Sequence, residues 1–457
     1  MKLSKFENHV SQKLGRSDLM SGSHRKDSNQ SKGKRNRLFA PRFVPTIFGA
    51  LAVSFISIYS TSAFAVMSLE GAFMAAFEND PQFQMAAPER DSNKAQAVAG
   101  WSAYIPTYTF QQTQMATDIS TRRIETLSVP ILDSAKAATV AQANSRYQFA
   151  KQTYITRVHD LAQRTLKAVD QWVLASEALR NNTSRIALLD NQYKGAKRKF
   201  ELGEGTITDL RDIEVKFNMA KADELTLQAQ KKIAARQVAI TTGTPPDNND
   251  FILPNTHSKH PLPDVDYVLA KVRDANPTVQ VARENADISK YNVASVAGQN
   301  LPSVYFTNLK TQYIGQTTYN NGISVNFPLQ VGQYVQTYAA AKQYSQADSQ
   351  KRDTQAKTEL EAERLHSLAE AGQEAIAIKK MAVDSAQLSV EANQKSFAAG
   401  VRSSTDVLNS IQVLFQTRND YAQAVTQQAE NYLNLLLIQA DDPVDAIRQT
   451  QVFLFRK

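Results

Sequence analysis

Residues 397–406, which read FAAGVRSSTD, decide the fold because the chain contains this stretch twice. The counterpart is residues 200–209, which read FELGEGTITD and begin 197 residues earlier. In both copies a glycine is followed by a hydroxyl residue, Thr206 or Ser403, and then by an aspartate. A glycine that ends one helix, placed before a residue that caps the next, predicts a helical hairpin. The recurrence predicts a duplicated chain.

Prolines mark the same duplication elsewhere in the chain. Pro81 returns as Pro277 and Pro106 returns as Pro302, so both pairs are 196 residues apart. Proline stops one helix and is tolerated in the first turn of another, so these positions predict helix boundaries. The expected layout is a first repeat at 66–240, a linker at 241–263, a second repeat at 264–440, and a C-terminal tail at 441–457 with no assigned element.

One β-hairpin is predicted in each repeat, after the second proline. Ile323, Val325 and Phe327 alternate with polar residues or proline, which is the pattern of a strand with one apolar face. Leu127 and Val129 repeat the pattern in the first half. The expected hairpins span about residues 107–131 and 303–329. The alternative interpretation is a pair of exposed hairpins on a soluble domain.

Long helices are predicted beyond the hairpins, where no proline interrupts the chain. Apolar residues, many of them alanine, recur every seven positions, as Trp172, Leu179 and Ile186 do in the first repeat. This spacing predicts close coiled-coil packing, and about 66 residues of helix would reach on the order of 100 Å. The expected elements are long helices at 133–200 and 332–397, turns at 201–208 and 398–405, and return helices at 209–240 and 406–440.

The net charge of +8 belongs to the N-terminal segment alone. Residues 1–42 hold eleven basic and three acidic residues, whereas the rest of the chain has 41 of each. A basic segment, an apolar run and small residues before Val66 predict a signal peptide at 1–65, with an uncleaved membrane anchor as the alternative. The neutral remainder gives no support for nucleic-acid binding.

No arrangement of residues in the sequence supports catalysis. Cysteine is absent, which excludes disulfides, thiol catalysis, cysteine-bound metal and a lipidated N-terminal cysteine. The histidines are scattered, and His257 and His260 lack an acidic partner at metal-site spacing. The sequence therefore predicts no enzyme, no metal and no cofactor. It also lacks a phosphate-binding glycine loop, so energy for transport would have to come from a partner.

Strands are the only segments that could place the exported chain in a membrane. After residue 65, no apolar run approaches the roughly 18 residues of a membrane helix. Strands cross a bilayer only as closed barrels of about eight or more. The four predicted strands fall short of that number. A barrel would have to be shared between chains, and three chains would supply twelve strands.

This order of elements resembles the TolC family of outer-membrane channel-tunnels. The resemblance covers about residues 68–440 and rests on prolines, hairpin, long helix, glycine turn and return helix, each present twice. It implies a mainly α fold with a small β part, in which duplicated long coiled-coil helices and two β-hairpins per chain form a trimeric twelve-stranded outer-membrane β-barrel continued by a periplasmic α-helical barrel. The implied partners are two further copies, outer-membrane lipid, a periplasmic adaptor (membrane fusion protein), and an inner-membrane ABC or proton-driven transporter.

The resemblance also implies a gate at the turns. In the family an aromatic residue, an arginine and an aspartate of the second turn close the periplasmic entrance, and the arginine pairs with a Thr-Asp of the first turn. The matching residues in this sequence are Phe397, Arg402, Asp406, Thr208 and Asp209. Phe397 replaces a tyrosine and so lacks its hydroxyl, and Asn409 replaces a second acidic residue, which would leave a trimer with one carboxylate ring instead of two. Helix capping alone is the alternative role of Asp209 and Asp406.

The tips of the turns resemble the family's docking site for the adaptor. The residues at these tips are Gly203, Glu204, Gly205, Gly400 and Val401. The expected function is an exit duct for type I protein secretion, because many channels dedicated to multidrug pumps resemble lipoproteins and this chain has no cysteine. A multidrug or small-molecule efflux channel is the alternative in the same class. A non-conducting structural coiled-coil protein of the cell surface is the alternative in another class.

Overall fold

The structure, a computed structural model, describes residues 67–115, 118–254, 261–328 and 331–454. The predicted signal peptide at 1–65 lies outside the described residues, as do His257 and His260. Residues Val66–Lys457 form one compact unit. Within the described part of this unit, none of the helices combines the length and the apolar character that a membrane span requires.

Long paired helices make up most of this unit, and each repeat begins with two shorter ones. The shorter helices are α2 (Leu69–Asn79) and α3 (Ala86–Trp101) in the first repeat, and α6 (Val265–Ala275) and α7 (Pro277–Gly298) in the second; the 3-10 turns η1 (Phe83–Met85) and η2 (Ser102–Tyr104) flank α3. The long helices are α4 (Ser134–Glu201) and α8 (Val331–Ala398), and the return helices are α5 (Ile207–Thr242) and α9 (Ser404–Ile438). The mainly α fold with duplicated long helices is confirmed.

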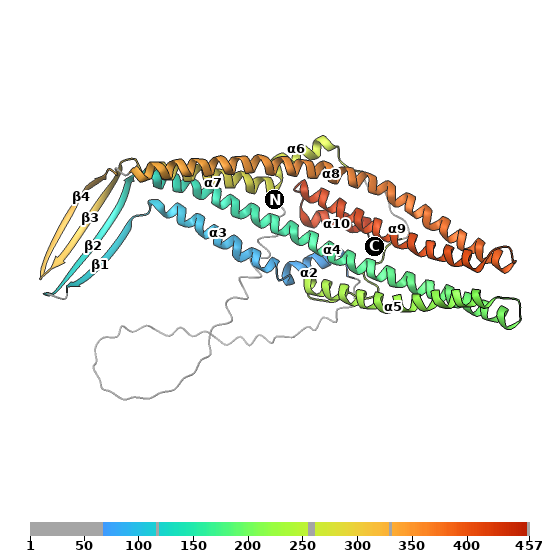
Figure 1. The fold of residues 1–457 in the computed structure, drawn as a ribbon. Coiled ribbons are helices and arrows are strands. Elements are labelled where there is room, and N and C mark those ends of the chain that lie inside the picture. The colour runs from blue at the N-terminus through green and yellow to red at the C-terminus, as the bar shows by residue number, and fades with distance from the viewer. Residues whose placement is uncertain (1–66, 116–117, 255–260, 329–330, 455–457) are drawn as a thin grey trace, which may run out of the picture. The chain divides into compact units, whose positions relative to one another are not determined.

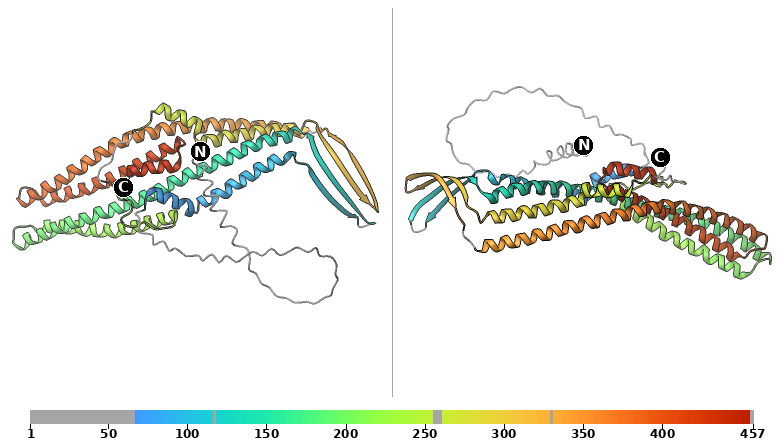
Figure 2. Two further views of the ribbon diagram at one scale, coloured as in Figure 1. Left: turned by 180° about the vertical axis from the view of Figure 1, so that it is seen from behind. Right: turned by 90° about the horizontal axis from the view of Figure 1, so that it is seen from above.

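All four strands form one antiparallel sheet in the order β1-β2-β3-β4. They are β1 (Thr107–Met115), β2 (Asp118–Leu132), β3 (Ser303–Tyr313) and β4 (Gln316–Asn326). The β2–β3 pairing joins the two repeats. Figures 1 and 2 show the sheet at one end of the unit and both glycine turns at the other. β4 ends before the expected residue 329 because Pro328 has no N–H for a ladder bond, whereas β2 passes Pro130 with a shift of register.

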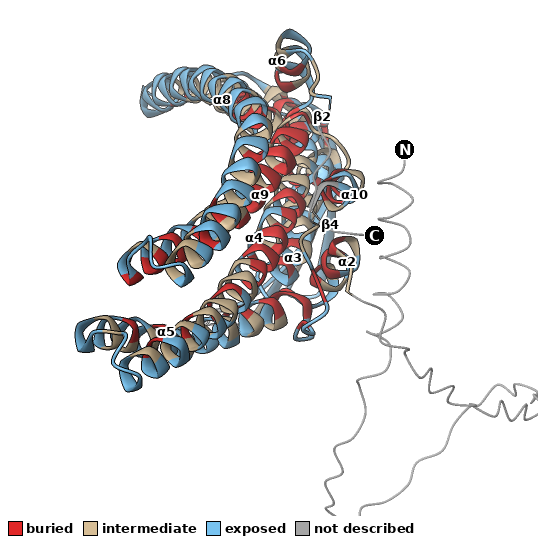
Figure 3. Cartoon of the chain, turned by 90° about the vertical axis from the view of Figure 1, so that its right-hand side faces the viewer, coloured by how far each residue is buried: buried red, intermediate tan, exposed pale blue. Residues whose placement is uncertain are grey.

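Helix α4 is the central element of the unit. It begins at Asp133, whose carboxylate accepts a hydrogen bond from the N–H of Lys136 at 2.9 Å. Of the predicted heptad positions, Trp172 is buried, whereas Leu179 and Ile186 are half-buried. α4 packs against α3, α5, α7 and α9, whereas α8 packs against α6, α7 and α9. The two long helices therefore meet through α7 and α9, and Figure 3 shows buried residues on the facing sides of α4 and α9.

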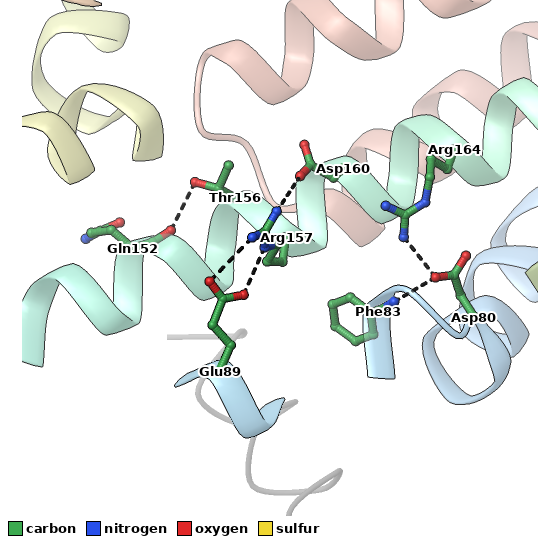
Figure 4. Close-up of polar contacts among 8 residues, drawn as sticks. All are labelled: Asp80, Phe83, Glu89, Gln152, Thr156, Arg157, Asp160 and Arg164. Carbon is green, nitrogen blue, oxygen red and sulfur yellow. Dashed lines mark hydrogen bonds and ion pairs between the residues drawn. The ribbon is translucent and has the colours of Figure 1, made fainter. Parts of the chain in front are cut away.

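The junction between α2 and α3 is fastened to α4 by polar contacts (Figure 4). The carboxylate of buried Asp80 accepts a hydrogen bond from the N–H of Phe83 at 2.7 Å. It also forms an ion pair with Arg164 at 2.9 Å. On α4, Arg157 lies before Arg164 in the sequence and forms an ion pair with Glu89 of α3 at 3.2 Å. The residue before Pro81 thus stops one helix and also aligns the next with α4.

The C-terminal tail contains a helix that the sequence analysis did not assign. Helix α10 (Pro443–Leu454) begins where Asp442 accepts a hydrogen bond from the N–H of Val444 at 2.9 Å. Its residues Ala446 and Ile447 are fully buried in a cluster with residues of α2, α4 and α9. Arg448 pairs with Glu70 of α2 at 2.6 Å. The end of the chain is therefore part of the main core.

Candidate functional site

The two glycine turns have the same backbone geometry. Gly203 and Gly400 both have a φ of 77°, a left-handed conformation that favours glycine. The N–H of the following residue, Glu204 or Val401, donates to a carbonyl of the preceding helix at 2.8 and 2.9 Å. These bonds satisfy carbonyls that a helix end would otherwise leave unpaired. The duplicated sequence thus folds into duplicated turns.

Hydroxyl residues cap the helices that leave both turns. Thr206 Oγ1 accepts from the N–H of Asp209 at 3.1 Å, and Ser403 Oγ accepts from the N–H of Asp406 at 3.2 Å. The Asp406 carboxylate in turn accepts from the N–H of Ser403 at 3.2 Å. This backbone bond and the Ser403 hydroxyl hold the pKa of Asp406 below its usual value, with a smaller contribution from Arg402. Asp406 thus forms its hydrogen bonds mainly within its own turn.

The two turns of one chain contact each other. The Ser404 hydroxyl of the second turn donates to Oδ1 of Asp209 in the first turn. This bond, together with the one from Thr206, lowers the pKa of Asp209. The ammonium group of Lys199 lies 4.5 Å from the centre of the Phe397 ring. Apolar residues beneath these contacts form one cluster that includes Leu189, Ala196, Ile213, Val390, Val407, Ile411 and Leu414.

The other predicted gate residues face solvent in a single chain. The Arg402 guanidinium lies 3.8 Å from the Asp406 carboxylate, and its side chain is 56% exposed. Among the described residues, that carboxylate is the only ion-pair partner of Arg402. Thr208 and Asn409 are exposed as well. The pairing of Arg402 with Thr208 and Asp209 of the other repeat therefore stays a prediction.

The predicted docking residues form the tips of the turns. In the second turn Val401 is 79% exposed and Gly400 is exposed beside it. In the first turn Gly203 and Glu204 are exposed. Leu202 is 67% exposed at the tip of the first turn, although the sequence analysis did not name it. Each turn thus presents a large apolar side chain next to its left-handed glycine.

Three residues of the site were missed at the sequence level, and each carries a signal. Leu202 is an apolar residue beside a turn glycine, where polar residues prevail. Ser404 stands where the first repeat has Ile207, 197 residues earlier, so the two copies differ by a hydroxyl. Lys199 precedes Phe200 in the last turn of α4, where a basic residue is usually assigned to helix capping.

The described residues contain no group of three or more histidine, aspartate and glutamate side chains that could hold a metal ion. His257 and His260, which the sequence did not support as a metal site, lie in the part of the chain that the structure does not describe. The chemistry of the turns is thus that of hydrogen bonds, ion pairs and apolar contact.

Known proteins with a similar sequence include outer-membrane proteins. Residues 268–439 match the family model described as outer membrane efflux protein. The alkaline protease secretion protein AprF of Pseudomonas aeruginosa is 26% identical over 417 residues, which cover 84% of this chain and 85% of that protein. The outer membrane protein TolC of Vibrio cholerae is 23% identical over 419 residues, 84% of this chain and 91% of that protein. These matches support a channel-tunnel of the TolC family.

A solved structure extends the TolC-family likeness to the fold. The crystal structure of the outer membrane protein VceC of Vibrio cholerae superimposes with a TM-score of 0.68 at 15% identity, over 81% of this chain and 95% of that chain. The family match and these relatives indicate a location in the outer membrane, with an extension into the periplasm. Its fold class and its location agree with the expectations from the sequence.

Proposed function

We propose that this protein is a passive exit duct of the outer membrane whose main role is type I protein secretion. The observation that carries the proposal is the division of one duplicated unit into two ends, with all strands at one end and both glycine turns at the other. The strand end suits a bilayer and the turn end suits a protein partner. A channel of this kind needs no catalytic residue, so we do not assign enzymatic activity.

Three copies of the chain are proposed to form the duct. The sheet of one chain leaves the outer edges of β1 and β4 without a strand partner within that sheet. Unpaired backbone groups are costly in lipid, so these edges need strands from other copies. Three copies would close a barrel of twelve strands. The helices of those copies would continue it as an α-helical barrel in the periplasm.

The turn end is proposed to receive a periplasmic adaptor. Helices of 68 residues such as α4 and α8 reach on the order of 100 Å, far beyond the thickness of a bilayer. The exposed Leu202 and Val401 offer apolar contact at the tips, and the flanking glycines allow a partner backbone to approach closely. The adaptor would connect the duct to an inner-membrane transporter, which supplies the energy.

The turns are also proposed to close the periplasmic entrance. Arg402 is exposed and only loosely paired within its own chain, so it is free to reach Thr208 and Asp209 of a neighbouring copy. Asp406 would add a ring of three carboxylates at the constriction. Asn409 would contribute no charge there, so selectivity for cations is expected to be weaker than with two acidic rings.

The combined change Arg402→Ser and Asp209→Ala tests the duct and its gate together. Removal of this cation and this anion abolishes the proposed ion pair between chains, so single-channel conductance in planar bilayers should rise severalfold. Arg211→Ser is the matched control, because Arg211 is an exposed arginine near the turn that pairs with Glu214 of its own helix. Wild-type conductance in the double variant would remove Arg402 from the gate, and a wild-type protein without any conductance would reject the duct.

Small-molecule efflux is the second candidate function. The matching family model carries the description outer membrane efflux protein, which favours this reading for a channel of the same architecture. The alkaline protease secretion protein, at 26% identity over most of both chains, supports protein secretion instead. The two roles share the duct and differ in the transporter that it serves.

A further inference from the structure

The two aspartates of the duplicated turns have different hydrogen-bond partners. Asp406 accepts bonds from the backbone and the hydroxyl of Ser403, so its carboxylate serves its own turn. Asp209 accepts a bond from the Thr206 hydroxyl on Oδ2 at 2.6 Å, while its Oδ1 accepts from Ser404 of the other turn. One copy of the aspartate has thus become a link between turns.

Position 404 shows the same divergence between the repeats. Ser404 is 2% exposed, whereas Ile207, the matching residue of the first repeat, is 48% exposed. A buried hydroxyl without a hydrogen-bond partner destabilises the folded state, so the bond to Asp209 accounts for a polar residue at a buried position. The duplication therefore does not explain why residue 404 is a serine. The hydrogen bond from Ser404 to Asp209 does.

A second contact joins the same two turns. Lys199 of the first hairpin lies over the Phe397 ring of the second, and the ring also packs on the apolar cluster below the turns. Phe397 itself has no hydroxyl, and the hydroxyl of the second turn that reaches Asp209 is that of Ser404. Both contacts lie within one chain, unlike the proposed Arg402 pairing between chains.

We propose that Ser404 is a gate-positioning residue that ties the two turns of each chain together through Asp209. A carboxylate oxygen has two lone pairs, so Asp209 can hold Ser404 and Thr206 and still accept an arginine from a neighbouring chain. The Ser404 bond fixes the direction in which Asp209 offers that remaining capacity. Loss of the bond would free the turns of one chain to separate and would also misalign the contact between chains. This inference rests on the proposed duct.

Ser404→Ala in the full-length protein tests the inference by single-channel recording in planar bilayers. A hydrogen bond to a charged group is worth enough to shift an equilibrium about tenfold, so the fraction of time in the open state should rise about tenfold. Asp209→Asn weakens both the bond from Ser404 and the proposed pairing with Arg402, so it should give at least as large a rise. In the double variant the rise should be smaller than the sum of the two single effects, because Ser404→Ala removes a bond that Asp209→Asn already weakens.

Thr405→Ala is the matched control, because Thr405 is the exposed neighbouring hydroxyl. It should keep wild-type gating. Wild-type gating in Ser404→Ala, in a protein that still assembles and melts like wild type, would overturn the role of Ser404; if Arg402→Ser with Asp209→Ala still raised conductance, the duct would stand. Additive effects of Ser404→Ala and Asp209→Asn would also overturn the link. Absence of conductance in every variant and in wild type would reject the duct itself.

Discussion

At the scale of single residues, Asp170 of α4 is unusual because its carboxylate is buried. It is 2% exposed, and neither of its carboxylate oxygens has a hydrogen-bond partner in the described chain. The bond between Asn181 and Asn419 sets an antiparallel register of α4 and α9, and three helical turns further on this register places Asp170 opposite Glu430. Burial, with a contribution from Glu430, raises the pKa of Asp170 well above its usual value.

Asp170→Asn should make the protein more stable at alkaline pH. The folded state holds the proton of Asp170 above the pH at which the unfolded state releases it, so stability falls as pH rises from about 4 towards the folded pKa. The neutral amide lacks this dependence. Its thermal midpoint should exceed that of wild type by several degrees at pH 8, and the gap should close towards pH 4. Asp160→Asn, an exposed aspartate of the same helix, is the control; a constant gap across this range would contradict the prediction.

At the scale of elements, α8 and α9 approach each other closely at Gly372. The buried Gln428 of α9 donates its amide N–H to the carbonyl of Ala369 at 2.7 Å, and its side chain lies against Gly372. A Cβ on Gly372 would lie 2.0 Å from Gln428 Oε1. The heptad pattern predicts that these helices pack, because alanines recur along the seam. The pattern does not predict the close contact, since a glutamine at helical spacing is usually assigned to the surface.

Gly372→Ala should destabilise the α8–α9 pair. The added methyl group would displace Gln428 and break its bond to α8, and overpacking of this kind costs about 1–3 kcal/mol. Urea denaturation should show the loss as a lower midpoint. Gly195→Ala on α4 is the matched control, because no atom lies within 4 Å of its added Cβ. The control should be neutral or stabilising by up to about 1 kcal/mol through helix propensity. Equal effects of the two changes would argue against a specific contact at Gly372.

At the scale of the whole molecule, the unit is long because its two ends serve different surroundings. The main core lies between these ends, where α2 and α10 pack with the middle of α4 and the C-terminal parts of α5 and α9. A second apolar cluster lies under the glycine turns, so the turn end has packing of its own. The packing under the turns is thus separate from the main core, which suits the proposed gate.

Deletion of the gene separates the two proposed cargoes. If the duct serves type I secretion, exported protein should disappear from the culture medium, because it has no other route across the outer membrane. Susceptibility to antibiotics should then remain close to wild type. The efflux alternative predicts the reverse, with hypersensitivity and normal secreted protein. Restoration by the wild-type gene is the control, and an unchanged phenotype in both assays would contradict an exit duct.

The sequence by itself determined the duplicated architecture, because its signals are local. Left-handed glycines, capping hydroxyls, prolines and a heptad period act within a few residues, so they predicted the turns at Gly203 and Gly400 and both long helices. Even α10 has a local signal, because Asp442 is a capping residue and Pro443 is tolerated in the first turn of a helix. Only the tertiary structure decided that Ser404 meets Asp209, that Gln428 fills the space beside Gly372, and that Asp170 is buried. These contacts join residues far apart in the sequence, and their geometry depends on how the helices pack.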